Sequence, residues 1–131
     1  MTADKISPLL RDFIQSSIDS VGTLEALLVF TRNPAAEWCA ESLCKELKTN
    51  VSWCTKQIEW LLSKSLIKPG AKKNSYQYSS RDPGTDTIIL ELMQVYSERR
   101  VSIINLISDN LIRVRQFANA FIFRKEEDEN D

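Results

Sequence analysis

The chain has 131 residues, of which 43% are hydrophobic and 27% charged; this composition is typical of one folded domain of ordinary size and not of a disordered chain. It contains no histidine, which excludes Ser-His-Asp and Cys-His catalysis and every His-containing zinc site. No apolar stretch approaches the roughly 20 residues needed to cross a bilayer, and the N-terminus lacks the basic start and apolar run of a signal peptide, so we expect a cytoplasmic protein without a membrane partner.

Two helices are predicted in the N-terminal part. Residues 7–18 place apolar side chains at helical spacing, and Ser7 is a suitable N-cap. Because this apolar stripe is narrow, we expect the helix to pack on another part of the protein or on a second copy. Ser20 is a credible cap for a second helix, which runs to about Arg32 and ends before Pro34.

Two more helices are predicted in the middle of the chain. Trp38 to about Lys48 returns to helical periodicity, and we interpret Trp38 as a core residue at the start of that helix. The next helix, over residues 50–64, has a single apolar stripe at spacings of three and four residues. Asn50 or Ser52 can cap it.

A short hairpin is predicted after these helices. Residues 65–68 lead from the helix into an extended segment, and residues 76–79 alternate aromatic and polar side chains as a half-buried strand does. The turn between them, residues 69–74, carries Lys72 and Lys73 at its tip.

The clearest break in the chain is at residues 81–84. A long helix is predicted from about Thr85, with apolar residues at helical spacing over some twenty positions, until a capping cluster at residues 108–110 interrupts or restarts it. A last amphipathic helix is predicted over residues 111–121, and the acidic residues 126–131 form a tail that we expect to be disordered.

The charge is unevenly distributed along the chain, although the formal net charge is −1. Residues 45–81 carry eight basic and two acidic side chains, whereas the segments on either side are net acidic. This pattern predicts an anionic partner for the middle segment alone.

The residue inventory predicts neither an enzyme nor a bound cofactor. The three glycines are scattered, so no Gly-rich phosphate loop is present. The three cysteines, Cys39, Cys44 and Cys54, include no C-x-x-C pair, and we interpret them as small apolar residues with free thiols. A metal site of three cysteines and a carboxylate stays formally possible, but no metal is predicted.

Residues 42–79, SLCKELKTNVSWCTKQIEWLLSKSLIKPGAKKNSYQYS, complete an order of three helices and a hairpin that starts at residue 20. This order resembles the winged helix-turn-helix of small bacterial regulators such as the MarR, PadR and ArsR groups. Leu43 and Leu47 then lie on the positioning helix, and Leu66 enters the wing after Ser65, where such proteins usually have glycine. The sequence of residues 90–125 is similar to the C-terminal part of uncharacterised bacterial winged-helix proteins, which implies no function.

The resemblance implies a mainly α fold with a small β-hairpin, a winged helix-turn-helix with extra N-terminal and C-terminal helices. Its parts are an N-terminal helix in residues 1–19, the winged-helix module in residues 20–81, a C-terminal helical dimerisation region in residues 82–125 and the tail in residues 126–131.

The resemblance also implies a dimeric transcriptional regulator that binds double-stranded DNA in a sequence-specific manner. In this fold the helix at residues 50–64 lies in the major groove and the wing touches the backbone or the minor groove. The basic side chains would attract phosphates, and the polar ones would contact base edges. The candidate DNA-binding residues are Lys48, Ser52, Trp53, Thr55, Lys56, Gln57, Lys64, Lys72 and Lys73.

Two features of the candidate recognition helix leave a second function open. The helix has no arginine, the commonest reader of guanine. Trp53 and Trp60 lie on its outward side, where they either fold back as core residues or form an aromatic patch that binds a protein. The alternative is therefore a winged helix used for protein–protein interaction without DNA binding.

The apolar stripe of the helices predicted after residue 82 is wider than a lone surface helix needs. We therefore expect a homodimer, which would present two recognition helices to a two-fold symmetric site. The candidate interface residues are Ile89, Leu92, Tyr96, Ile103, Ile107, Leu111 and Phe117. The alternative is that these side chains cover the core of their own chain. No polar cluster marks a pocket for a small-molecule effector.

Overall fold

The computed structural model describes residues 6–80 and 82–109. Within this part, helices and strands are α1 (Pro8–Ser17), α2 (Val21–Arg32), β1 (Glu37–Trp38), α3 (Ala40–Leu47), α4 (Val51–Ser63), β2 (Ile67–Pro69), β3 (Tyr76–Tyr78) and α5 (Pro83–Glu98). Residues 100–109 are also helical. The predicted last helix and acidic tail lie outside the described residues.

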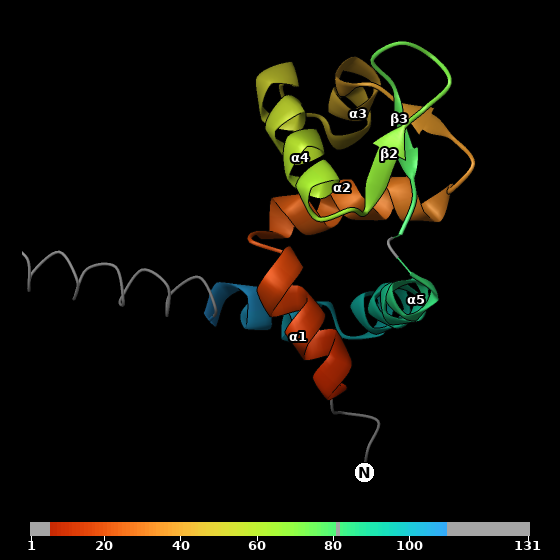
Figure 1. The fold of residues 1–131 in the computed structure, drawn as a ribbon. Coiled ribbons are helices and arrows are strands. Elements are labelled where there is room, and N and C mark those ends of the chain that lie inside the picture. The colour runs from red at the N-terminus through yellow and green to blue at the C-terminus, as the bar shows by residue number, and fades with distance from the viewer. Residues whose placement is uncertain (1–5, 81, 110–131) are drawn as a thin grey trace, which may run out of the picture.

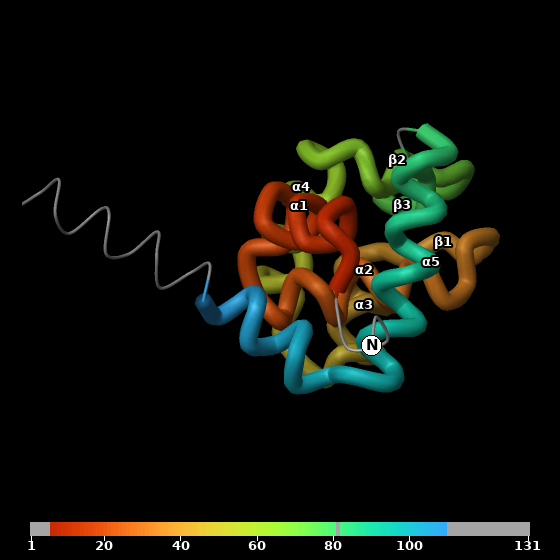
Figure 2. The backbone as a smooth tube through the Cα atoms, turned by 90° about the horizontal axis from the view of Figure 1, so that it is seen from below, coloured from red at the N-terminus to blue at the C-terminus, as the bar shows by residue number. Residues whose placement is uncertain are grey.

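The helices and strands form two groups, one on each side of α2 (Figure 1). Helices α3 and α4 and the small sheet lie above α2 in this view, and α1 and α5 lie below it. Seen from below in Figure 2, α5 and residues 100–109 border α1. The fold is therefore mostly helical with a small antiparallel sheet, as the sequence predicts, and this arrangement is consistent with a winged-helix protein.

The helix starts follow the predicted capping residues. The side chains of Ser7, Ser20 and Asn50 accept hydrogen bonds from backbone N–H groups in the first turns of α1, α2 and α4. Such caps satisfy donors that have no partner inside the helix. The alternative cap at Ser52 is wrong, because this residue lies within α4.

The sheet has three strands and not the two that the sequence predicts. Its order is β1-β3-β2, and both neighbouring pairs are antiparallel. Trp38 belongs to β1, where it pairs with Tyr76, so its assignment to a helix is wrong. Helix α3 begins two residues later because Cys39 caps it: the Cys39 thiol accepts from the Ser42 backbone, and the Ser42 hydroxyl accepts from the Cys39 backbone.

The long C-terminal helix is interrupted earlier than the sequence predicts. Helix α5 ends at Glu98, and Arg99 leaves helical geometry with φ −135° and ψ 54°. The helical segment then resumes at residue 100. This break lets Tyr96 before it and Ile103 after it both reach the core, where they are 7% and 0% exposed.

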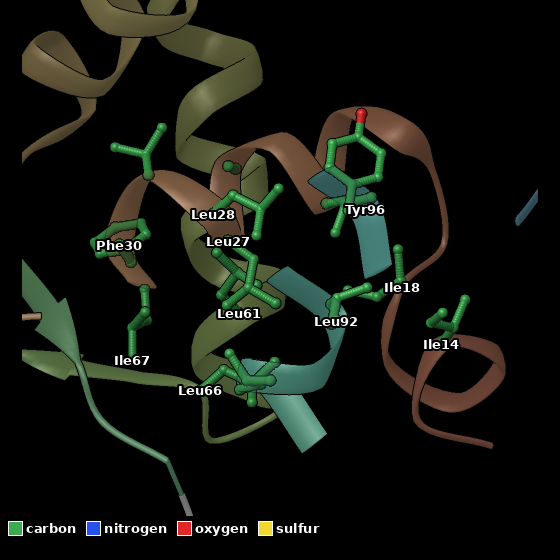
Figure 3. Close-up of a cluster of buried hydrophobic side chains, with 14 of the residues drawn as sticks. Ile14, Ile18, Leu27, Leu28, Phe30, Leu61, Leu66, Ile67, Leu92 and Tyr96 are labelled. Carbon is green, nitrogen blue, oxygen red and sulfur yellow. The ribbon is translucent and has the colours of Figure 1, made fainter. Parts of the chain in front are cut away.

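The hydrophobic core surrounds α2. Leu24, Leu27 and Phe30 of this helix are completely buried. Figure 3 shows side chains of α4, the first wing strand and α5 meeting those of α2, with Ile14 and Ile18 joining from α1 and the residue after it. The helices below α2 thus cover the same core as those above it.

No single helix in residues 6–80 and 82–109 is long and apolar enough to span a membrane. Helices α1 and α2 taken together reach the length and composition of a span, but they are bent by 109° at the break between them.

Candidate nucleic-acid interface

The face of α4 that points away from the molecule is polar. Ser52, Thr55 and Lys56 are exposed on it, whereas Cys54, Ile58 and Leu61 face the core. The Thr55 hydroxyl donates to the Val51 carbonyl oxygen at 2.9 Å, which leaves its oxygen free to accept further bonds. This face therefore offers hydroxyl and ammonium groups to a partner.

A second side of α4 turns toward α1 and α2. The Trp60 indole N–H donates to the Ser17 carbonyl oxygen at 2.7 Å, and the Thr23 hydroxyl donates to the side-chain oxygen of Gln57 at 2.7 Å. The ring of Trp53 lies against Gly22 at the start of α2. These three α4 residues are half-buried, and both tryptophans pack against the core.

These contacts bear on the aromatic patch that the sequence leaves open. A hot-spot anchor must enter a pocket on its partner, but the two indole rings already contact their own chain. The Lys64 ammonium lies 4.8 Å from the centroid of the Trp60 ring and covers it further. Among the candidate DNA-binding residues, Trp53, Gln57 and Lys64 thus lie beside the outward face rather than on it.

The wing carries the other group of candidates. Lys72 and Lys73 are exposed in the loop between β2 and β3. The wing loop and α4 lie in the upper half of the view in Figure 1, away from α1 and α5. Lys48, the last candidate, is exposed at the end of α3 with φ 56°.

Glu37 of β1 accepts hydrogen bonds from the wing loop, residues 70–75. One of its carboxylate oxygens accepts from the Lys72 backbone N–H at 2.9 Å and from the Ser75 hydroxyl at 2.5 Å. The carboxylate also occupies the space where Gly70 would carry a side chain. These hydrogen bonds, the Lys72 backbone bond first, lower the pKa of Glu37 below its ordinary value of 4.5. This role of Glu37 was not predicted from the sequence, since Glu37 precedes the wing by some thirty residues.

Two tyrosine hydroxyls fix α5 to the other elements. Tyr78 of β3 donates to Asp86 at 2.6 Å, and Tyr96 donates to Glu25 of α2 at 2.7 Å. Burial, followed by the bond to Asp86, raises the pKa of Tyr78, and burial also raises the pKa of Tyr96. Both tyrosines therefore act as neutral donors at physiological pH.

Five of the candidate dimer residues are buried within the single chain. None of them is more than 7% exposed, so they cover the core of their own chain, the alternative that the sequence leaves open. These residues are Ile89, Leu92, Tyr96, Ile103 and Ile107. Leu111 and Phe117 lie outside the described residues.

The three cysteines are free thiols. Cys54 is buried, and this burial raises its pKa; the Cys44 thiol donates to the Thr49 carbonyl oxygen at 2.5 Å. No group of three or more potential metal ligands occurs in the part of the chain that the structure describes. The Trp38 indole nitrogen is buried without a hydrogen-bond partner there.

No protein-family model matches the chain, and no curated protein matches its sequence. Among solved structures, the chain is similar to a protein from Methanosarcina mazei Go1 described as a possible transcriptional regulator, with 19% sequence identity and a TM-score of 0.48. The similarity covers 76% of this chain and 88% of the other. At this level of similarity, the description applies to that protein alone.

Proposed function

We propose that the chain is a winged-helix transcriptional regulator that binds double-stranded DNA through α4 and the wing. The observation that carries the proposal is the exposed polar face of α4, formed by Ser52, Thr55 and Lys56. Hydroxyl and ammonium groups on one helix face can contact both base edges and phosphates. A helix of 13 residues is about 20 Å long, enough to lie across the major groove.

The wing supports the same proposal through its charge. Lys72 and Lys73 are exposed, and the two hydrogen bonds from the loop to Glu37 limit its motion. A loop held in this way brings its lysines to a duplex at a lower entropy cost than a free loop would. Lys48, directly after α3, and Lys56 of α4 add two more exposed cations, and such cations supply sequence-independent attraction to phosphates.

Homodimerisation stays a prediction. Because the five residues described above are buried in their own chain, a dimer would have to use other side chains. Leu90 of α5 and Val101 in the helical segment after it are exposed at 66% and 68%, and they provide apolar surface for such an interface. Sedimentation equilibrium of the full chain measures the oligomeric state directly.

The decisive experiment measures how duplex affinity depends on salt. The logarithm of the binding constant should fall linearly with the logarithm of the salt concentration, by about 0.9 per phosphate contact. Changing Lys72→Gln and Lys73→Gln together should reduce this slope by about 2, and Lys56→Gln should reduce it by about 1. Sequences selected from a random duplex pool would then define the site.

Arg11→Gln is the matched control. This arginine is exposed on α1, a helix that lies on the opposite side of α2 from the wing in Figure 1, so removing its charge should leave the slope unchanged. An affinity that does not respond to Lys56, Lys72 and Lys73, or that responds equally to Arg11, would refute the proposal.

A further inference from the structure

A groove with a volume of about 270 Å³ lies between α3, α4 and the wing. Its apolar lining comes from Val51, Ile58 and Leu62 of α4, and Tyr76 of β3 adds an aromatic ring. Val51 is 41% exposed although it is a large apolar residue. The groove thus presents apolar surface to solvent beside the face of α4 that we propose for DNA.

Two carboxylates line the same groove, Glu41 of α3 and Glu59 of α4. Both are exposed. Neither side chain forms a hydrogen bond or an ion pair with any other residue in the described part of the chain, even though Lys45 follows Glu41 by one helical turn. The two carboxylates are therefore unpaired with other side chains of the described residues, next to the basic segment of residues 45–81.

Such carboxylates do not favour contact with a nucleic acid, because a phosphate backbone is repelled by like charge. They favour a cation instead, and an aromatic ring such as that of Tyr76 also attracts cations, in particular substituted ammonium groups. A bare metal ion is a poorer match, because apolar side chains form part of the groove lining and no group of three metal-binding side chains exists among the described residues.

We propose that this groove binds a small organic cation, a substituted ammonium group attached to an apolar body. The ammonium group lies between Glu41 and Glu59, and the apolar body contacts Val51, Ile58 and Leu62. A ligand in this position occupies space beside Thr55, which also lines the groove, and so competes with a duplex for α4. This competition rests on the proposed function, whereas the binding of the cation does not.

The binding is tested on the full chain without DNA, with benzyltrimethylammonium as the probe. Titration followed by amide NMR should shift signals of residues around the groove, including Thr55 and Tyr76. Changing Glu41→Gln and Glu59→Gln together should weaken binding by about tenfold, since each exposed carboxylate contributes modestly. The amide spectrum of the variant also reports whether it is folded.

Glu46→Gln is the matched control, because Glu46 is an exposed glutamate of α3 that does not line the groove. It should bind the probe as the unaltered chain does, and phenylacetate, which replaces the ammonium group by a carboxylate, should cause no shifts. Shifts elsewhere on the molecule, equal affinity for phenylacetate, or undiminished affinity in the double glutamine variant would overturn the proposal.

The competition is tested separately by adding the probe to a protein–duplex mixture. Release of the duplex by the probe in the unaltered chain, and its absence in the double glutamine variant, would support a regulatory role. If the chain binds no duplex at all, the proposed function fails, and the NMR titration still decides whether the groove binds cations.

Discussion

The contact between Gly22 and Trp53 gives a quantitative test of how α2 and α4 pack. A Cβ atom at Gly22 would lie 2.5 Å from Cζ2 and 3.2 Å from Cη2 of the Trp53 ring. The first distance is much shorter than the roughly 3.5–4.0 Å at which carbon atoms pack. The Gly22→Ala substitution must therefore push the indole ring, or α4 with it, away from α2.

The expected destabilisation is about 1–2 kcal/mol. Inserting one methyl group into a packed contact costs about 1–3 kcal/mol. The higher helix propensity of alanine returns up to about 1 kcal/mol, and less at the second position of a helix, where Gly22 lies. If the alanine met no steric conflict, it would only raise the free energy of unfolding through its higher helix propensity. The sign of the change in the free energy of unfolding therefore distinguishes the two cases.

Urea unfolding of the two variants Gly22→Ala and Gly84→Ala measures this difference. Gly84 is the matched control because it is the second residue of α5, and its added Cβ would approach only the Asp82 carboxylate oxygen, at 3.1 Å. We expect Gly84→Ala to change the free energy of unfolding by no more than about 0.5 kcal/mol. Tryptophan fluorescence should change for Gly22→Ala and not for Gly84→Ala.

A double-mutant cycle identifies Trp53 as the cause. In a Trp53→Phe background, Gly22→Ala should cost less, because the smaller ring does not reach as far toward α2. A Gly22→Ala protein as stable as the unaltered chain, or an equal cost in both backgrounds, would show that the close contact described here does not exist.

Three further predictions concern hydrogen bonds and backbone conformation. Glu37→Gln should lower the protection of the Lys72 amide, which is its hydrogen-exchange rate compared with the intrinsic rate at the same pH. In the unaltered chain the lowered pKa of Glu37 means that its stabilisation is present above the unfolded-state pKa and is lost as pH falls through the folded-state pKa. The protection of Lys72 should therefore also fall in that acidic range, and protection that stays constant across it would contradict this. Tyr96→Phe removes the bond to Glu25 and should lower the free energy of unfolding by about 1 kcal/mol in urea; no loss would mean that the bond contributes nothing. Ser65→Gly should raise the free energy of unfolding by about 0.5 kcal/mol, because Ser65 has φ 60°, a conformation that glycine adopts without strain. The control Ser63→Gly, within α4, should lower the free energy of unfolding. Equal effects of the two substitutions would argue against a left-handed conformation at residue 65.

The parts of the fold that depend on local signals were predicted from the sequence. Ser7, Ser20 and Asn50 cap helices where the sequence places them, because capping is decided within four residues of the chain. Ser65 lies at the entry to the wing, where glycine is usual in the proteins that the sequence resembles. Its positive φ explains that preference for glycine.

The missed parts depend on contacts between distant residues. β1 has only two residues, too few for any periodicity, and Glu37 acts on atoms 35 and 38 residues away. The break at Arg99 has no proline or glycine to mark it. The sequence also could not decide whether Ile103 is buried by its own chain or by a second copy, because both arrangements need the same apolar side chain.

In the candidate interface, too, local features were predicted and contacts between distant residues were missed. The outward positions of Ser52, Thr55 and Lys56 follow from helical periodicity alone. Trp53 and Trp60 are placed outward by the same rule, but α1 and the start of α2 cover that side of α4. The sequence does not predict that Glu41 and Glu59 line one groove, since only the fold brings them together.

The bond between Glu37 and the wing loop has a consequence for protein engineering. A chimera that receives only residues 70–75 from another protein would place a foreign loop against Glu37, whose carboxylate accepts hydrogen bonds from Lys72 and Ser75 of the native loop. Recombination libraries that exchange this loop should therefore transfer residues 37 and 70–75 together, although two helices separate them in the chain.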